Sequence, residues 1–251
     1  MPLEVIFLGT NGWYDTLTGN TICILIRAKD CHIIFDAGYG LYKADRYIEE
    51  GDDRPVYLFL SHFHLDHIVG LHTLTKFRFP GGLTIIGPKS SRDILDIILN
   101  DPFTISLKDL PYPAKAIELP EERDLLPITV TAKPLRHASF TLGYRIELEG
   151  RTISYCPDTG YCANAVELSA AADLLIAECA YKSGQSNESW PHLNPETAAR
   201  IAKEAGALRM ALVHFDAGTH PTMADRRDSE MAARKIFPEA FATIDDMLVQ
   251  I

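Results

Sequence analysis

The junction between a predicted buried strand and a histidine-rich segment constrains this chain more than any other feature. Residues 56–60, Val-Tyr-Leu-Phe-Leu, are continuously apolar, which predicts a strand covered on both faces. Three imidazoles and a carboxylate follow within six positions: His62, His64, Asp66 and His67. Neutral imidazole and carboxylate are preferred ligands of zinc and related divalent metals. The alternative is a solvated histidine-rich turn, but a tract this dense is more typical of metal binding.

The spacing within this segment suggests how it could serve two ions. In an extended chain, His62 and His64 point to the same side, so both can bind one ion. If the chain turns into a helix at Asp66, that carboxylate and His67 are directed toward a second point nearby. A rigid strand before the segment would hold all four side chains in place.

Three further candidate ligands each close a predicted apolar strand. They are His137, Asp158 and His214, which follow strands predicted over 128–133, 151–155 and 208–213. Each residue alone is as compatible with a hydrogen-bonded loop position as with a metal ligand. Together they support a ligand set, because such a set draws residues from several strand ends.

The rest of the chain alternates short apolar runs with clusters of glycine, proline and aspartate. Further strands are predicted over residues 3–8, 21–27, 31–36, 83–87, 142–148 and 173–177. Short turns favour antiparallel pairing of the early strands, and Glu149-Gly150 predicts a tight hairpin turn. Asn194-Pro195 predicts the start of a helix that runs to about Ala205 and stops at Gly206.

Three shorter segments complete the expected organisation. Ser90 or Ser91 is predicted to cap a helix over 92–99. Residues 101–127, rich in proline and acidic residues, are predicted to form an irregular crossover. Trp13 and Tyr14, after the first strand, could stack on a base or a sugar, although an ordinary loop anchor is as compatible with the sequence.

Composition narrows the class of protein. With 251 residues, 47% of them hydrophobic, the chain can bury one sizeable core, which favours a single α/β domain. A net charge of −10 argues against a protein that works mainly by neutralising a long phosphate backbone. The five cysteines form no C-x-x-C pair and are expected to be reduced thiols. A cytoplasmic protein without membrane contact is expected, because no apolar run reaches roughly 20 residues and the N-terminus lacks a basic region.

Taken in chain order, the seven candidate ligands resemble the metal-binding motifs of the metallo-β-lactamase fold superfamily. The segments Phe7–Gly12 and Ile33–Gly38 also match, so the resemblance covers nearly the whole chain. It implies one hydrolase domain over residues 1–251, with an α/β fold in the form of a four-layer αβ/βα sandwich.

The resemblance also implies a cofactor of two divalent metal ions, usually zinc, with manganese or iron as alternatives. His62, His64 and His137 would hold one ion, Asp66, His67 and His214 the other, and Asp158 would bridge the two. Such ions share a water, lower its pKa and present it as a metal-bridging hydroxide. Asp66 would be catalytic as well, by orienting this nucleophile and taking its proton.

Two residues beyond the ligands resemble the phosphodiesterase branch of the superfamily, which includes ribonuclease Z and small phosphodiesterases. Glu178 ends the strand predicted over 173–177, and His192 precedes the helix that starts at Asn194. By this resemblance His192 would be a catalytic acid that protonates the departing alkoxide, and Glu178 would orient it. The alternative, that His192 only stabilises the helix start, stays open.

The chain departs from ribonuclease Z between two of these motifs. Ribonuclease Z carries a long arm rich in glycine and proline before its bridging aspartate, and this arm grips transfer RNA. Here His137 and Asp158 are only 21 residues apart, which leaves room for one hairpin. Residues 10–20 also lack the cysteines of a zinc-binding insertion found in a small phosphodiesterase of phosphonate breakdown. Transfer RNA is therefore not expected as a partner, and the resemblance gives the reaction class but not the substrate.

The sequence thus predicts a dinuclear metal-dependent hydrolase that cleaves a small or nucleotide-like phosphodiester. A lactonase or thioesterase of the same fold is the alternative enzyme. A metal-binding accessory protein without turnover is the alternative of another class, although no ligand is lost. Because many relatives are dimers, a homodimer is a further expectation.

Overall fold

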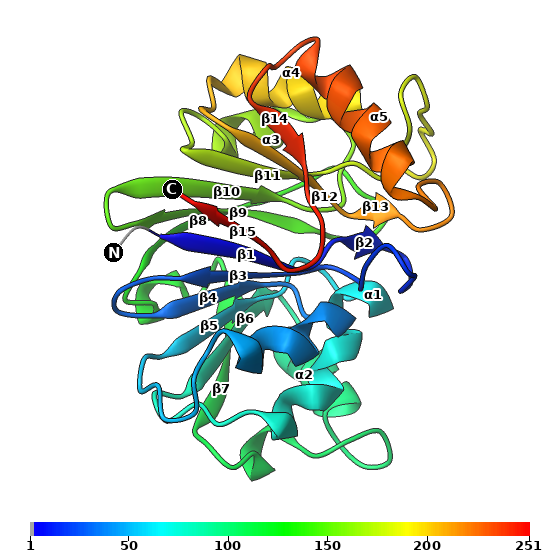
Figure 1. Ribbon diagram of the computed structural model, residues 1–251. Coiled ribbons are helices and arrows are strands. Elements are labelled where there is room, and N and C mark those ends of the chain that lie inside the picture. Colours follow the sequence, from blue (N-terminus) through cyan, green and yellow to red (C-terminus); the bar gives the residue numbers. More distant parts are fainter. Residues whose placement is uncertain (1–2) are drawn as a thin grey trace.

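Two β-sheets packed face to face, with helices on both outer sides, form the body of the protein (Figure 1). The computed structural model describes residues 3–251. Its layers run helix, sheet, sheet, helix, so the expected α/β four-layer sandwich is confirmed.

The first sheet has seven strands in the order β15-β1-β3-β4-β5-β6-β7. Their bounds are β1 Glu4–Gly9, β3 Cys23–Arg27, β4 His32–Phe35, β5 Val56–Phe59, β6 Leu83–Pro88, β7 Ala114–Leu119 and β15 Met247–Gln250. The early strands β1, β3 and β4 pair antiparallel, as their short turns predict, and β4 to β7 are parallel. On its outer face lie η1 (Tyr39–Arg46), α1 (Leu65–Ile68), η2 (Val69–Lys76) and α2 (Ser91–Ile98).

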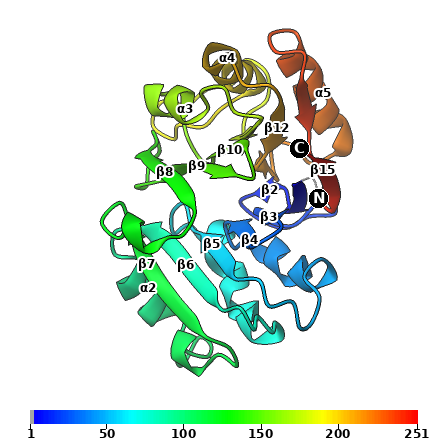
Figure 2. The same ribbon diagram turned by 90° about the vertical axis from the view of Figure 1, so that its left-hand side faces the viewer.

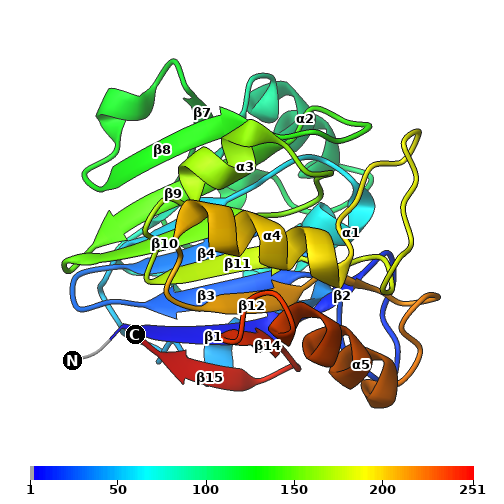
Figure 3. The ribbon, with the colours of Figure 1, turned by 90° about the horizontal axis from the view of Figure 1, so that it is seen from above.

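The second sheet has six strands in the order β14-β12-β11-β10-β9-β8. Their bounds are β8 Thr129–Pro134, β9 Leu142–Leu148, β10 Arg151–Cys156, β11 Leu174–Glu178, β12 Met210–Val213 and β14 Ala240–Ala242. Figures 2 and 3 show α3 (Ala163–Leu168), α4 (Pro195–Ala205) and α5 (Met223–Arg234) lying across its outer face. Strands β10, β11, β12 and β14 are parallel, so their carboxyl ends meet at one edge.

Side chains point alternately to the two faces of each sheet, and this explains why the apolar runs are continuous. On β3, Ile24 and Ile26 join the core between the sheets, whereas Cys23 and Leu25 pack under the helices of the first sheet. Because both faces of each sheet are covered, a central strand can be apolar at every position.

A third, very short pairing joins the two halves of the molecule. Strand β2 (Asn11–Gly12) pairs in parallel with β13 (Phe215–Asp216). Figure 3 shows β2 at the end of the sandwich opposite the C-terminal residue. This junction lies beside the candidate site, because β13 begins directly after His214.

Several local predictions are confirmed. Glu149 and Gly150 connect β9 to β10 with positive φ angles of 53° and 75°, as a tight hairpin turn requires. The Asn194 side chain accepts a hydrogen bond from the Thr197 N–H at the start of α4, and Gly206 ends the helix in the left-handed conformation. All five cysteines are free. No helix within residues 3–251 is long and apolar enough to cross a membrane.

Two predictions are wrong in part. The region 101–127 was expected to be irregular, but besides η3 (Leu107–Asp109) and η4 (Arg123–Leu125) it contains β7. This strand lies at the edge of its sheet and buries only Ile117 and Leu119, so its apolar signal is short. Ser90 occupies the cap position of α2 without a side-chain cap, and the Ser91 hydroxyl donates to the Pro88 carbonyl instead of capping the helix.

Candidate metal centre

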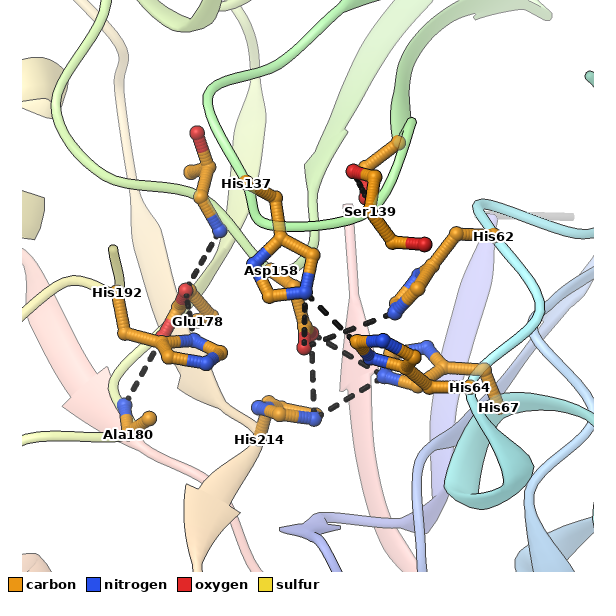
Figure 4. Close-up of polar contacts among 12 residues, drawn as sticks. His62, His64, His67, His137, Ser139, Asp158, Glu178, Ala180, His192 and His214 are labelled. Atoms are coloured by element: carbon orange, nitrogen blue, oxygen red, sulfur yellow. Dashed lines mark hydrogen bonds and ion pairs between the residues drawn. The ribbon is translucent and has the colours of Figure 1, made fainter. Parts of the chain in front are cut away.

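The seven candidate ligands lie together at one end of the sandwich, although they come from both sheets. Figure 4 labels all of them except Asp66. The loop after β5 and the start of α1 supply His62, His64, Asp66 and His67. The loops after β8, β10 and β12 supply His137, Asp158 and His214. The carboxyl ends of β5, β10 and β12 therefore bring together residues that are up to about 150 positions apart in the sequence.

His62, His64 and His137 form one group, called here the three-histidine subsite. His64 Nδ1 lies 3.4 Å from His137 Nε2. Asp158 Oδ2 lies 3.8 Å from His62 Nε2 and 3.7 Å from His137 Nε2. Two ligands on a tetrahedral zinc ion, with bonds of about 2.0–2.1 Å, are separated by roughly 3.4 Å. These spacings suit an ion at the centre of the group.

Asp66, His67 and His214 form a second group, called here the Asp66 subsite. His67 Nε2 lies 3.1 Å from His214 Nε2, which lies 3.2 Å from Asp66 Oδ2. Asp158 Oδ1 is 3.1 Å from His67 Nε2 and 3.2 Å from His214 Nε2. Asp158 thus turns one oxygen to each subsite, as a bridging ligand would.

Buried atoms without partners also suit metal ions. Within residues 3–251, His62 Nε2 and Asp158 Oδ1 are buried and have no hydrogen-bond partner. A buried polar atom without a partner is costly, and a metal ion would satisfy both. Burial lowers the pKa of His62, His64 and His137, which favours the neutral imidazole that binds metal. Burial also lowers the pKa of His67 and His214, but the carboxylates of Asp158 and Asp66 outweigh it and raise the pKa of both. The donor atoms therefore suit divalent ions, and binding of an ion would displace protons from these two histidines.

Asp36, which sequence reasoning did not assign a role, orients two of the candidate ligands. This fully buried residue accepts hydrogen bonds from the Tyr155 hydroxyl at 2.6 Å and the Ser61 hydroxyl at 2.8 Å, and it lies 2.8 Å from His67 Nδ1. The Ser61 oxygen lies 2.9 Å from His62 Nδ1. Both imidazoles therefore keep their Nδ1 hydrogen toward Asp36 or Ser61 and present Nε2 to the centre. The only sequence signal was the Ile33–Gly38 segment, in which a lone aspartate after an apolar run has no defined role.

Three residues around the centre have a strained backbone conformation. Trp13, Asp36 and His214 have φ angles of 77°, 55° and 53°, a left-handed region that residues other than glycine rarely occupy. The Trp13 backbone N–H donates to Asp66 Oδ2 at 2.8 Å. A Cβ on Gly12 would lie 2.5 Å from the His214 ring, so any side chain there would displace that ring.

Glu178 and His192 form the pair expected from the sequence. Glu178 is fully buried at the end of β11, and its Oε1 lies 2.7 Å from His192 Nδ1. Burial alone lowers the pKa of His192, but the Glu178 carboxylate outweighs this effect and raises it to about 9. Because Asn194 and Thr197 cap α4, the helix start does not depend on His192. The imidazole is therefore a protonated group beside the centre at neutral pH.

A pocket of about 110 Å³ opens over these residues. Asp66, Asp158, His192 and His214 line it, so both subsites and the Glu178–His192 pair share one cavity. The ring of His192 lies 5.0 Å from that of His137 and 6.0 Å from that of His214. A substrate in this pocket would contact the metal subsites and His192 at once.

Comparison with known proteins places this site in a family. Residues 32–215 match the family model described as beta-lactamase superfamily domain. The chain belongs to this superfamily. The matched range contains all seven candidate ligands, as well as Glu178 and His192.

Curated relatives of this superfamily member include two ribonucleases Z. The ribonuclease Z of Limosilactobacillus fermentum is 25% identical over 277 aligned positions, which cover 86% of this chain and 88% of the relative. That of Bacillus thuringiensis strain Al Hakam is 26% identical over 275 positions, which cover 85% and 88%. The superfamily member is accordingly a metal-dependent hydrolase of the ribonuclease Z-like branch, and the alternative of an accessory protein without turnover is set aside.

Solved structures agree with the fold. The metallo-beta-lactamase fold protein YhfI from Bacillus subtilis has a TM-score of 0.80 and 25% identity, with both chains fully covered. The short form of human tRNase Z has a TM-score of 0.73 and 24% identity over 99% of both chains, a likeness of fold. The names of these relatives weigh against the expectation that transfer RNA is not a partner.

Proposed function

We propose that this hydrolase is a two-metal phosphodiesterase that cleaves a small or nucleotide-like phosphodiester. The Glu178–His192 pair carries the proposal, because a departing alkoxide needs an acid that protonates it. His192 lines the pocket beside both subsites, and its Nδ1 is held at 2.7 Å by a buried carboxylate. Its Nε2 is then the atom that faces a substrate.

The metal assignment is part of this proposal. His62, His64 and His137 would hold one ion, Asp66, His67 and His214 would hold the other, and Asp158 would be a ligand of both. Zinc suits a set dominated by imidazole, with manganese and iron as alternatives. When bound, two such ions lower the pKa of a water and polarise a phosphoryl oxygen.

The chain's own residues divide the remaining work. Asp66, fixed by the Trp13 backbone N–H, orients the attacking water and accepts its proton. His192 donates its Nε2 proton to the leaving oxygen. The Thr159 N–H donates to Glu178 at 2.6 Å and fixes its carboxylate, which keeps the imidazole protonated until the bond breaks.

Three observations favour a small substrate over transfer RNA, in spite of the relatives' names. The segment between His137 and Asp158 is the β9–β10 hairpin, so the described residues contain no arm there. The alignment with the Limosilactobacillus ribonuclease Z runs over 277 positions, more than the 251 residues of this chain, so that relative has segments which this chain lacks. The net charge of −10 also offers little to a long phosphate backbone.

Two properties of the whole chain complete the proposal. Residues 1–251 act as one hydrolase domain, because the proposed ligands at positions 62 and 214 come from different sheets and meet in one site. A homodimer is proposed from the family resemblance, and light scattering on the purified protein tests it by measuring the molar mass in solution.

The test is an activity screen of protein loaded with zinc, manganese or iron. We expect cleavage of bis(p-nitrophenyl) phosphate and of cyclic nucleotides. His192→Ala should lower the rate by about 10²- to 10⁴-fold for diesters with alkyl leaving groups, but little for p-nitrophenyl esters, because p-nitrophenolate leaves without a proton. His72→Ala, at an exposed histidine outside the pocket, is the matched control and should change neither rate.

Two outcomes would contradict the proposal. Turnover of lactones or thioesters without any phosphodiester would favour the alternative enzyme. Cleavage of a transfer RNA precursor by protein that leaves every small diester intact would show that the substrate class is wrong.

A further inference from the structure

Both tryptophans of the chain, Trp13 and Trp190, line the pocket over the candidate metal centre. Trp13 follows β2, and Trp190 lies in the segment between β11 and α4. Their side chains are 63% and 37% exposed. Two large apolar rings that remain exposed in one polar pocket mark a surface for a ligand.

The two tryptophans contact different parts of the ligand cluster. The Trp13 backbone N–H is bonded to Asp66 of the Asp66 subsite. The Trp190 ring stacks on His64 with a centroid distance of 5.8 Å and an interplanar angle of 11°, and it lies 5.7 Å from His137. A phosphodiester bound between the subsites would therefore lie in a pocket that both indoles line.

The fold fixes the backbone that carries both rings before a ligand binds. The Asn11 side-chain amide donates to the Gly19 carbonyl at 2.8 Å and closes the loop that carries Trp13, whose φ of 77° the surroundings impose. The Tyr181 hydroxyl donates to the Trp190 carbonyl at 2.7 Å. A surface fixed in this way loses little conformational entropy when it binds.

The charge around the pocket limits what else a ligand can carry. Within the described residues 3–251, no lysine or arginine lines the pocket, whereas the Asp216 carboxylate does. Lys182, which follows the lining residue Tyr181, forms an ion pair with Asp225, and Arg136, beside His137, forms one with Glu188. Both of these carboxylates lie outside the pocket lining. A second phosphate, beyond the one at the metal subsites and His192, would meet Asp216 and no lysine or arginine of the pocket lining.

We infer that the substrate is a singly charged phosphodiester that bears a planar aromatic group, such as a nucleobase or an aryl ester, and no second phosphate. Trp13 and Trp190 select it by stacking on that group. This inference rests on the proposed phosphodiesterase activity and narrows its substrate class.

A binding experiment tests the aromatic preference without turnover. Because the chain has only two tryptophans, their fluorescence reports on this pocket alone. Phenyl methylphosphonate and methyl methylphosphonate carry one charge each and differ only in the aromatic group. Titrated into zinc-loaded and metal-free protein, the phenyl probe should bind about tenfold more tightly in each form. Equal affinities would overturn the inference.

Substitutions of the two tryptophans test whether stacking on the indoles, and not the shape of their loops, causes the preference for the phenyl probe. Trp190→Leu should reduce the preference for the phenyl probe to about twofold or less, and Trp13→Leu should also reduce it, whereas Trp13→Phe should retain most of it. Leu17→Ala is the control, because Leu17 is fully exposed on the same loop and lies outside the pocket. A preference that survives in both leucine variants would contradict the role of the indoles.

Kinetics distinguish this inference from the proposed function. Phenyl and methyl p-nitrophenyl phosphate share a leaving group, and kcat/KM should favour the phenyl ester by about tenfold. If neither ester is cleaved, the phosphodiesterase proposal fails. If both are cleaved with equal kcat/KM, that proposal stands and the aromatic inference is wrong.

A second phosphate provides the charge test. Thymidine 5′-(p-nitrophenyl phosphate) should lose about tenfold in kcat/KM when a 3′-phosphate is added. Thr219→Lys, which introduces a cation into the pocket lining, should recover part of that loss. A 3′-phosphate that raises kcat/KM in the unmodified protein would overturn the single-phosphate part of the inference.

Discussion

The two halves of the molecule build their parts of the centre in different ways. The first sheet supplies four of the seven candidate ligands from one short stretch, residues 62–67. The second sheet supplies one side chain from each of several strand ends, and these are His137, Asp158 and His214. The first half is therefore a local motif, whereas the second half exists as a site only when its sheet is assembled.

Each half also places a fully buried carboxylate behind its functional side chains, and the two carboxylates face different targets. Asp36 contacts His67 directly and His62 through Ser61. Glu178 contacts His192, which belongs to neither metal subsite as defined above. In the proposed function, the first half orients metal ligands, while the second half adds the acid that protonates the leaving group.

The bridging residue gives the largest expected effect, because it belongs to the second half but serves both subsites. Asp158→Ala should lower the rate of phosphodiester hydrolysis by about a thousandfold or more, and it should lower the metal content per chain. Elemental analysis and a diesterase assay measure the two effects. A variant that keeps two ions and normal turnover would show that the two halves do not share a ligand.

The contact between the halves gives the next effect. Gly12→Ala should lower kcat/KM by about a hundredfold, because the new methyl group would displace the His214 ring. Gly218→Ala is the matched control, since a methyl group at that position would lie 3.4 Å from its nearest neighbour, an ordinary contact. Equal activity of the two variants would mean that the His214 position is not critical.

The two buried carboxylates can be compared directly. Asp36→Asn should weaken metal binding by about 10- to 100-fold, because it removes the charge beside His67 and replaces a carboxylate oxygen, which accepts hydrogen bonds, with an amide group that only donates them. Glu178→Gln should leave metal binding close to normal and lower turnover of alkyl diesters. Metal titration with a competing chelator, alongside kinetics, separates the two cases. If Glu178→Gln weakened metal binding and Asp36→Asn affected only turnover, the roles assigned to the two carboxylates would be wrong.

The smallest effect concerns acid stability. Burial, with Lys182 and Arg226 nearby, lowers the pKa of His220 to about 4. Burial also lowers the pKa of His32, but the Asp52 carboxylate partly offsets this shift. In the unfolded chain His220 becomes protonated near pH 6.5, whereas in the folded chain it stays neutral until about pH 4. The free energy of unfolding therefore falls as the pH decreases through this window. The loss reaches about 3 kcal/mol.

Substitution should reveal this difference between the halves. When the pH falls from 7 to 4, the unfolding free energy of His220→Gln should decrease by up to about 3 kcal/mol less than that of the unmodified protein. For His32→Gln the difference from the unmodified protein should be smaller. Urea unfolding at both pH values measures this. An identical pH dependence in all three proteins would exclude His220 as the source.

The same contrast explains what could be predicted from the sequence. Residues 62–67 are dense enough to indicate metal binding by themselves, and continuous apolar runs located most strands of both sheets. Asp36 was not assigned because its role depends on Ser61 and Tyr155, which meet it only in the fold. The stacking of Trp190 on His64 escaped prediction for the same reason. Strand β7 was missed because an edge strand buries few side chains.

The pairing of β2 with β13 joins positions about 200 residues apart in the sequence. Closing so long a loop costs entropy before its contacts repay it, which makes this junction a late event in folding. A partly folded chain would offer a metal ion only the 62–67 loop, with weak affinity and no enclosed pocket. Tight metal uptake would then report that the chain has finished folding, and hydrolytic activity would begin only at that point.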